Sequence, residues 1–305
     1  MKIGIIGSGA LGLYYGAMLQ RSGQEINFLL RRDYQVIGQQ GLQVYSVNGD
    51  FHLPHVAGYP TVQEIGTVDL VIVGLKTISN HHLIDLVSPL LGAETAILTL
   101  QNGLGNEELL AEAFGAERIL GGVAFLCSNR GEPGIVHHLG EGKIRLGEFS
   151  GGLSERSHDL AAMFQNAGVP CTAISDLRRA RWEKLVWNIP FNGLSALLAK
   201  DVTDLLDHPP TKRLVRDLML EVIAGANAQE LEEPIDGPGF SQQLISFTEN
   251  MDHYQPSMMI DRAAGRPLEL GAIYTTPLQR AKAAGINMSR VEMLYSQLDF
   301  GENLP

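Results

Sequence analysis

A lysine and two asparagines, Lys184, Asn188 and Asn192, follow one another at intervals of four residues. On a helix this spacing stacks them on one face, so the segment predicts a row of one ammonium and two carboxamides. Such a row could supply a proton and fixed hydrogen bonds to a polar substrate. A solvent-facing polar stripe is the alternative. Pro190 removes a backbone donor between the two asparagines and is expected to kink the helix there.

The segment Gly7-Ser-Gly-Ala-Leu-Gly12 has the G-x-G-x-x-G spacing of a dinucleotide-binding turn. It follows an isoleucine-rich strand pattern at residues 2–6 and precedes a helical pattern and a second strand pattern at residues 26–30. In this context the first glycine permits a tight turn, the second lets N–H groups approach a pyrophosphate, and the third allows close helix packing. We predict a dinucleotide at the positive end of the helix, with a ligand-free glycine turn as the alternative.

Two arginines, Arg31 and Arg32, stand at the end of the second strand pattern, where an NAD site usually has a carboxylate. A guanidinium can hold the 2′-phosphate of NADP by charge-assisted bonds, whereas a carboxylate would repel it. NADP is therefore the preferred cofactor, with Arg31 as its contact. The alternative, a merely exposed arginine, applies more to Arg32.

Other polar residues follow the next predicted strands, at residues 69–73 and 95–100. Lys76 follows the first, and Asn102 follows the second, directly before Gly103. Ligands of open α/β sheets bind beyond the carboxyl ends of strands, so both residues are expected at the same crevice as the glycine turn. A solvated lysine and a simple turn are the alternatives. Ser257 and Glu269 border a loop in the second half, where either could be only a helix cap.

Other chemistries are poorly supported. The segment Gly193-Leu-Ser-Ala-Leu lacks the second glycine of a nucleophile elbow. The pairs His81-His82 and His137-His138 hold adjacent side chains that diverge, so we expect no metal site.

Strand patterns fill the first half of the chain, with short runs at residues 122–126, 135–136 and 143–146 completing the sheet. A helix is expected at residues 154–167. Long 3.6-residue periodicity then takes over, at residues 178–198 and 211–232. The change predicts an α/β protein with an N-terminal Rossmann-type doubly wound sheet, residues 1–173, and a C-terminal all-helical domain, residues 174–305.

The composition narrows the classes of ligand. The chain has 305 residues, of which 45% are hydrophobic, and a formal net charge of −11. An acidic surface disfavours nucleic acid, and a small molecule is the expected partner. Glycines interrupt the uncharged run at residues 3–19, so we expect neither a signal peptide nor a membrane span. Two cysteines suit a cytoplasmic location. The oligomeric state stays open, with a homodimer as one alternative.

Together these motifs resemble the ketopantoate reductase (2-dehydropantoate 2-reductase) family over essentially the whole chain. The likeness includes Glu132-Pro-Gly-Ile-Val-His137, Trp182-Glu-Lys184-Leu and Gly265-Arg-Pro-Leu-Glu269, in the same order along the chain. It implies NADPH-dependent reduction of 2-dehydropantoate to pantoate on the route to pantothenate and coenzyme A.

The resemblance also implies roles for individual residues. Lys184 would be the proton donor, and the substrate contacts would be Asn102, Lys184, Asn188, Asn192 and Ser257. The implied cofactor contacts are Gly7, Ser8, Gly9, Ala10, Leu11, Gly12, Arg31, Lys76, Asn102, Cys127 and Glu269. Hydride addition to a 2-oxo carbon leaves an alkoxide that a cationic lysine stabilises and protonates. Because free lysine has a pKa of about 10.4, we expect Lys184 to be charged at neutral pH without special tuning.

The sequence also departs from the family pattern. The stretch 199–204 lacks the further asparagine usual there, Tyr254 stands where another polar ligand is common, and proline precedes Asn192 instead of following it. These departures leave two alternatives open: a reductase of another branched 2-oxo or 3-hydroxy acid, and a non-catalytic NADP-binding sensor. A sensor would have no need of the proton donor Lys184.

Overall fold

The computed structural model describes residues 1–302, which divide into two compact units. Unit 1 comprises residues 1–101 and 106–177, and unit 2 comprises residues 102–105 and the chain from Arg178 onward. The division at 177/178 lies beyond the predicted boundary at 173/174. The sequence also gave no sign that the short loop 102–105 belongs with the helical unit.

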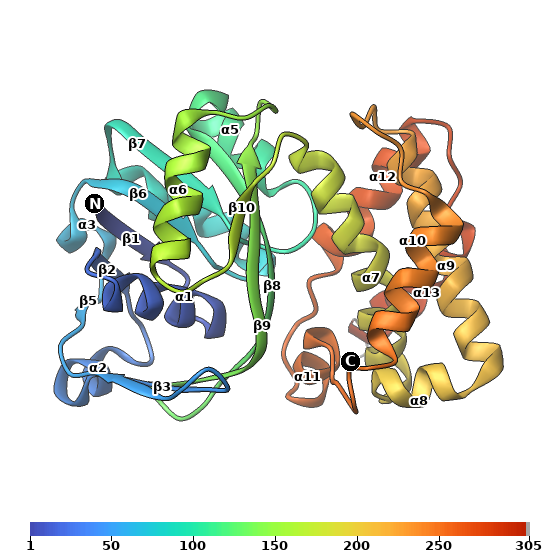
Figure 1. Cartoon of the computed structure of the whole chain (residues 1–305), viewed down its shortest axis with the longest axis horizontal. Coiled ribbons are helices and arrows are strands. Elements are labelled where there is room, and N and C mark those ends of the chain that lie inside the picture. Colours follow the sequence, from blue (N-terminus) through green and yellow to red (C-terminus); the bar gives the residue numbers. More distant parts are fainter. Residues whose placement is uncertain (303–305) are drawn as a thin grey trace. The chain divides into compact units, whose positions relative to one another are not determined.

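Unit 1 is built on one sheet (Figure 1). Its strands are β1 (Lys2–Ile6), β2 (Glu25–Leu29), β3 (Leu42–Ser46), β4 (Phe51–Leu53), β5 (Ala57–Tyr59), β6 (Val68–Val73), β7 (Leu91–Thr99), β8 (Ile119–Arg130), β9 (Ile135–Glu148) and β10 (Cys171–Ala173). Six of them run parallel in the order β5-β2-β1-β6-β7-β8, and β9 then pairs antiparallel with β8. This is the strand order of a Rossmann-type sheet.

Helices cover both faces of this sheet because its central strands are apolar on both sides. Ile5 packs with α1 (Ala10–Arg21) and α6 (Glu155–Asn166), whereas the next residue, Ile6, packs with α3 (Val62–Ile65), α4 (Leu83–Val87) and α5 (Asn106–Phe114). The remaining helical segments of unit 1 are α2 (Tyr34–Gln40) and the 3₁₀ turns η1 (Thr77–His82), η2 (Ser88–Leu90) and η3 (Ala116–Arg118).

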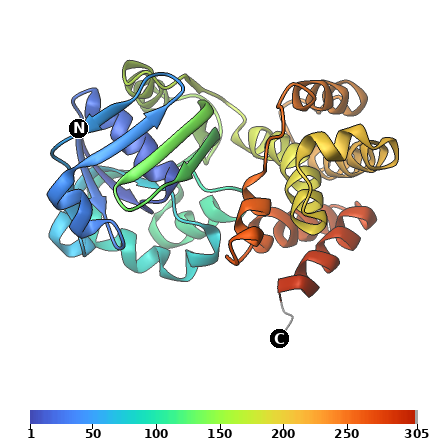
Figure 2. The same ribbon diagram turned by 90° about the horizontal axis from the view of Figure 1, so that it is seen from below.

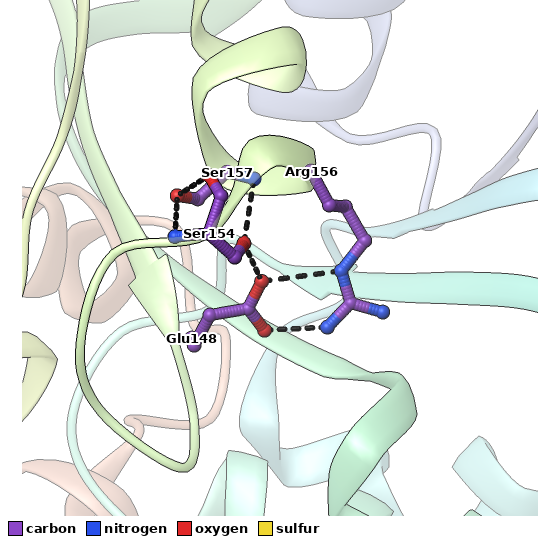
Figure 3. Close-up of polar contacts among 4 residues, drawn as sticks. All are labelled: Glu148, Ser154, Arg156 and Ser157. Atoms are coloured by element: carbon purple, nitrogen blue, oxygen red, sulfur yellow. Dashed lines mark hydrogen bonds and ion pairs between the residues drawn. The ribbon is translucent and has the colours of Figure 1, made fainter.

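The start of α6 shows how polar contacts fix a connection within unit 1 (Figure 3). Ser154 caps the helix by accepting from the backbone N–H of Ser157, at 3.0 Å. The Ser154 hydroxyl donates to Glu148 at the end of β9, and Arg156 forms an ion pair with the same carboxylate. The cap and the ion pair together tie the helix to the strand that precedes it.

The secondary-structure elements in the described part of unit 2 are all helices, joined by loops (Figures 1 and 2). It contains α7 (Leu177–Leu198), which starts at the division between units, α8 (Val202–Asp207), α9 (Pro209–Asn227), α10 (Gly237–Thr248), α11 (Ser257–Ala263), the π-helical turn η4 (Gly271–Thr275), α12 (Thr276–Ala283) and α13 (Ser289–Glu302). The predicted class, an α/β chain with a Rossmann-type doubly wound sheet followed by an all-helical domain, is thereby confirmed.

Helix α7 continues through Pro190 instead of ending there. The hydroxyl of Tyr274 donates to the carbonyl of the preceding Ile189 at 2.7 Å, which satisfies a backbone acceptor beside the proline. Gly193 makes room for this contact, since a Cβ there would lie 2.3 Å from the Tyr274 oxygen. Lys184, Asn188 and Asn192 consequently all lie on one uninterrupted helix, as the spacing predicted.

Candidate active site

The glycine turn between β1 and α1 is closed so tightly that two of its glycines cannot be replaced without a clash. Gly7 has φ +102°, and a Cβ there would lie 2.3 Å from the backbone nitrogen of Leu75. A Cβ on Gly12 would lie 2.2 Å from the Gly7 carbonyl oxygen. Gly9 differs, because a Cβ there would meet nothing within 4 Å. Gly9 thus faces open space, as expected of a glycine that lets a ligand approach the backbone.

The first residues of α1 supply backbone donors to that open space. Gly9 is the N-cap without a side-chain cap, and its carbonyl accepts the first intrahelical bond, from Leu13. The N–H groups of Ala10 and Leu11 precede this bond and have no partner inside the helix. Ser8 does not cap the helix, because its hydroxyl donates to the Leu29 carbonyl at the end of β2, at 2.7 Å. Ser8 therefore anchors the turn to the neighbouring strand.

The two arginines at the end of β2 differ in the contacts that they make. Both side chains are exposed, and Arg32 donates to the Gly131 carbonyl at 3.0 Å. Among the described residues, the Arg31 guanidinium makes no hydrogen bond or ion pair, so it is available to an anion. The nearest carboxylate along the chain, Asp33, is buried, ion-paired with Arg130 and accepts from the Gly134 N–H. The carboxylate of Asp33 is thereby occupied by contacts within unit 1.

Two other predicted cofactor residues belong to the same unit. Lys76 is at the N-cap position of η1, after the end of β6, and follows Leu75, whose backbone nitrogen closely approaches Gly7. Cys127 lies half-buried on β8. It is not joined to the buried Cys171 by a disulfide.

In unit 2, Lys184 contacts Asn102. The ammonium Nζ donates to the carboxamide Oδ1 of Asn102 at 2.7 Å, so that the oxygen of Asn102 faces the lysine. The loop carrying Asn102 is held in this unit by a bond from the Leu104 N–H to the Ala272 carbonyl, at 3.0 Å. Gly103 is required for this approach, because a Cβ would lie 2.4 Å from the same carbonyl oxygen.

The pKa of Lys184 differs from that of an ordinary lysine. Desolvation by burial, the larger cause, and the neighbouring cation Arg181 together lower the pKa of Lys184 to about 7, although the carboxylate of Glu269 opposes the shift. The expectation of an untuned, fully charged lysine at neutral pH is therefore wrong. Arg181 itself is 4% exposed and Glu269 is 7% exposed. No role was predicted for Arg181 from the sequence, although its position one helical turn before Lys184 was a usable signal.

The two asparagines on α7 differ in what their carboxamides contact. The Oδ1 of Asn192 accepts from the backbone N–H of Met258 at 3.1 Å and from the Ser257 hydroxyl at 3.4 Å. Because a backbone N–H can only donate, the contacting atom must be the oxygen, which leaves the Asn192 amide group as a donor. Asn188 is 5% exposed, and its side chain makes no hydrogen bond to the described residues. Ser257 is the exposed first residue of α11.

The predicted residues thus form two sets. Unit 1 contains the glycine turn, Arg31, Lys76 and Cys127. Unit 2 contains Asn102, the α7 row, Ser257 and Glu269. The first set fits a dinucleotide phosphate, because the opening at Gly9 combines backbone donors with an available guanidinium. Across residues 1–302 there is no cluster of three or more side chains suited to a metal ion. In the same range no helix has both the length and the apolar character needed to cross a bilayer.

Comparisons with known proteins cover both units. Residues 3–151 match the family model described as Ketopantoate reductase PanE/ApbA, and residues 176–302 match that of its C-terminal part. The chain is 43% identical over 304 residues to the 2-dehydropantoate 2-reductase of Nostoc sp., which covers 98% of this chain and 94% of that protein.

Two crystal structures of proteins with the same name are also similar. That from Geobacter metallireducens has a TM-score of 0.97 at 59% identity and covers 99% of this chain and 100% of that one. The structure from Methylococcus capsulatus has a TM-score of 0.90 at 30% identity, and the match covers 99% of this chain and 97% of that one.

Proposed function

Since this chain belongs to the ketopantoate reductase family, we propose that it is an oxidoreductase that reduces 2-dehydropantoate to pantoate with NADPH. The single observation that carries the proposal is the contact of Lys184 with Asn102, at 2.7 Å, together with the lowered pKa of this lysine. An ammonium with a pKa near 7 is a proton donor matched to neutral pH.

The proton transfer is the step that this chain's own residues perform. The chemistry that NADPH would supply when bound is hydride donation to the 2-oxo carbon, which would leave negative charge on the carbonyl oxygen of the substrate. Lys184 stabilises this charge and transfers a proton from Nζ to the oxygen, leaving a neutral amine and a 2-hydroxy acid. The Oδ1 of Asn102 accepts one N–H bond of the ammonium and so helps to orient the proton donor. A positioned acid of this kind contributes about 10² to 10⁴ in rate.

The substrate is held by donors on α7 and α11. We propose that the Asn192 amide group, oriented by the Met258 N–H on the opposite side of the carboxamide, donates to the substrate. Asn188 and Ser257 complete the set of polar groups for the carboxylate and hydroxyl of 2-dehydropantoate. Their arrangement suits an anionic, hydroxylated small acid.

NADPH is favoured over NADH by the end of β2. The exposed Arg31 guanidinium is available for the 2′-phosphate, and the carboxylate of Asp33 is occupied by Arg130. The proposed cofactor set further contains residues 7–12, Lys76, Asn102, Cys127 and Glu269. The cytoplasm as compartment and a homodimer as oligomeric form stay predictions.

Two other functions remain as alternatives with different outcomes. A reductase of another branched 2-oxo acid would use the same Lys184 chemistry with a different substrate preference. A non-catalytic NADP sensor would bind the cofactor alone, and the buried polar groups around Lys184 argue against it, since their desolvation serves no purpose in mere cofactor binding.

The decisive experiment follows NADPH oxidation with 2-dehydropantoate and a panel of other branched 2-oxo acids. We expect the highest kcat/KM with 2-dehydropantoate and a loss of about 10²-fold or more in Lys184→Ala. Lys200→Ala is the matched control, because that lysine is exposed and pairs only with Asp204 one turn away. A better substrate in the panel would favour the related reductase, and cofactor binding without any turnover would favour the sensor. Turnover that survives Lys184→Ala would refute the mechanism.

A further inference from the structure

One carboxamide in unit 1 holds both ends of the loop that carries Asn102. Asn80, in the 3₁₀ turn η1, accepts from the Gln101 side chain through Oδ1 at 2.8 Å. Its Nδ2 donates to the Asn106 side chain at 2.9 Å. Gln101 and Asn106 are the residues directly before and after loop 102–105, so a single side chain links the two points where the chain leaves and re-enters unit 1.

Both anchor points are buried and rigidly attached. Gln101 is 3% exposed, and its side-chain oxygen accepts from the Thr99 hydroxyl at the end of β7, at 3.1 Å. Asn106 is 1% exposed and begins α5. A polar network buried in this way is stable only when its members are satisfied, so the loss of its central member would leave two buried groups without that partner.

The loop itself has little rigidity of its own. Two of its four residues, Gly103 and Gly105, are glycines with positive φ, +79° and +95°. Glycine restricts the backbone less than any other residue, so the placement of the loop depends on how its ends are held as well as on the bond from Leu104 to Ala272. Asn102, whose Oδ1 accepts a hydrogen bond from the Lys184 ammonium, is the first residue after the Gln101 anchor.

We propose that Asn80 is a positioning residue for the reduction, which by bonding to Gln101 and Asn106 fixes the loop and so sets Asn102 against Lys184. The inference rests on the proposed function, because it assigns Asn80 an effect on that reaction. Asn80 needs both halves of its carboxamide for this role. Aspartate, of nearly the same shape, keeps the acceptor but turns an oxygen toward the Asn106 oxygen, so Asn80→Asp should behave like Asn80→Ala.

A double-mutant cycle tests whether Asn80 acts through Asn102. We expect Asn80→Ala to lower kcat/KM for 2-dehydropantoate by about 10- to 100-fold, as small misplacements of catalytic groups do. In the Asn102→Ala background the same substitution should cost less than about 2-fold, because the group it positions is already gone. Asn48→Ala, at an exposed position between β3 and β4, is the matched control and should leave the activity unchanged. Equal losses in both backgrounds would overturn the proposal.

Hydrogen exchange gives a second test that needs no substrate. The Leu104 amide is bonded to the Ala272 carbonyl, and its exchange rate reports on how well the loop is held. We expect this amide to exchange at least about 10-fold faster in Asn80→Ala than in the wild type or Asn48→Ala. An unchanged rate would overturn the proposal. If the wild type fails to reduce 2-dehydropantoate, the proposed function fails, while the exchange rate still decides whether Asn80 holds the loop.

Discussion

The lowered pKa of Lys184 predicts an unusual dependence of the reduction on pH. The reduction needs the charged ammonium, and the pKa of this group is about 7 in the free protein. As the pH rises through this value the proton donor is lost. The value of kcat/KM should fall to about one tenth of its low-pH plateau at pH 8 and to about one hundredth at pH 9. A lysine with the ordinary pKa of about 10.4 would give a nearly constant rate over this range.

The reverse reaction should show the opposite dependence on pH. Oxidation of pantoate needs neutral Lys184 as a base, so its kcat/KM should rise with pH through the same pKa and level off above it. Both directions can be followed by NADPH absorbance in one buffer series. The loss of activity in one direction and its gain in the other should both follow the titration of Lys184.

Replacing Arg181 identifies the source of the shift. Arg181 lowers the pKa of Lys184, so Arg181→Met should move the falling limb of the reduction profile to higher pH. Methionine keeps much of the buried volume. Arg178→Met is the matched control on the same helix, since that guanidinium donates to the Gln229 carbonyl and is not among the groups that shift Lys184. A wild-type profile that is flat to pH 9 would refute the argument, as would a limb that both substitutions move equally.

Three further outcomes concern the cofactor and the helical core. Arg31→Ala should weaken NADPH about 10- to 100-fold and leave NADH nearly unchanged in fluorescence titrations. Arg32→Ala should weaken NADPH far less. Equal losses of NADPH and NADH affinity in Arg31→Ala would show that Arg31 does not bind the 2′-phosphate. Gly9→Ala should keep the wild-type melting temperature and lose cofactor affinity, whereas Gly7→Ala should lower the melting temperature because its Cβ would clash. Tyr274→Phe should cost about 1–3 kcal/mol in urea denaturation; no loss would mean that its buried hydrogen bond contributes nothing.

The sequence predicts the centre of the parallel sheet well because the buried parts of β1, β6 and β7 are apolar on both faces. The run 2–6 coincides with β1, and the glycine turn and the helix after it are where the motif places them. The strands β3, β4 and β5 were not foreseen, since they are at most five residues long and carry exposed side chains. Their pairing depends on distant partners, and no local pattern records it.

Two further differences between the predicted and the observed bounds of elements have causes in the tertiary structure. The runs 135–136 and 143–146 belong to one long strand, β9, because the polar residues between them, such as His137 and Glu141, stay paired with β8, and the register shifts pass over only Leu139 and Gly142. The helix expected over residues 211–232 ends at Asn227, whose carboxamide accepts from the Ile235 N–H and donates to the Ile235 carbonyl. This bond to a returning loop competes with continuation of the helix.

The same distinction between local and distant causes separates the predicted chemistry of the site from its tuning. Spacing alone placed Lys184 in line with two asparagines, but its pKa depends first on burial, then on Arg181 one helical turn away, and also on Glu269, far away in the sequence. The consequence is chemical: a lysine of pKa near 7 is a much stronger acid than an ordinary one, yet about half of it is still charged at neutral pH. Stronger acidity speeds protonation of a developing alkoxide, and partial deprotonation allows the same group to accept the proton in reverse. Burial of Lys184 thereby suits a reversible exchange of a proton with a 2-hydroxy acid.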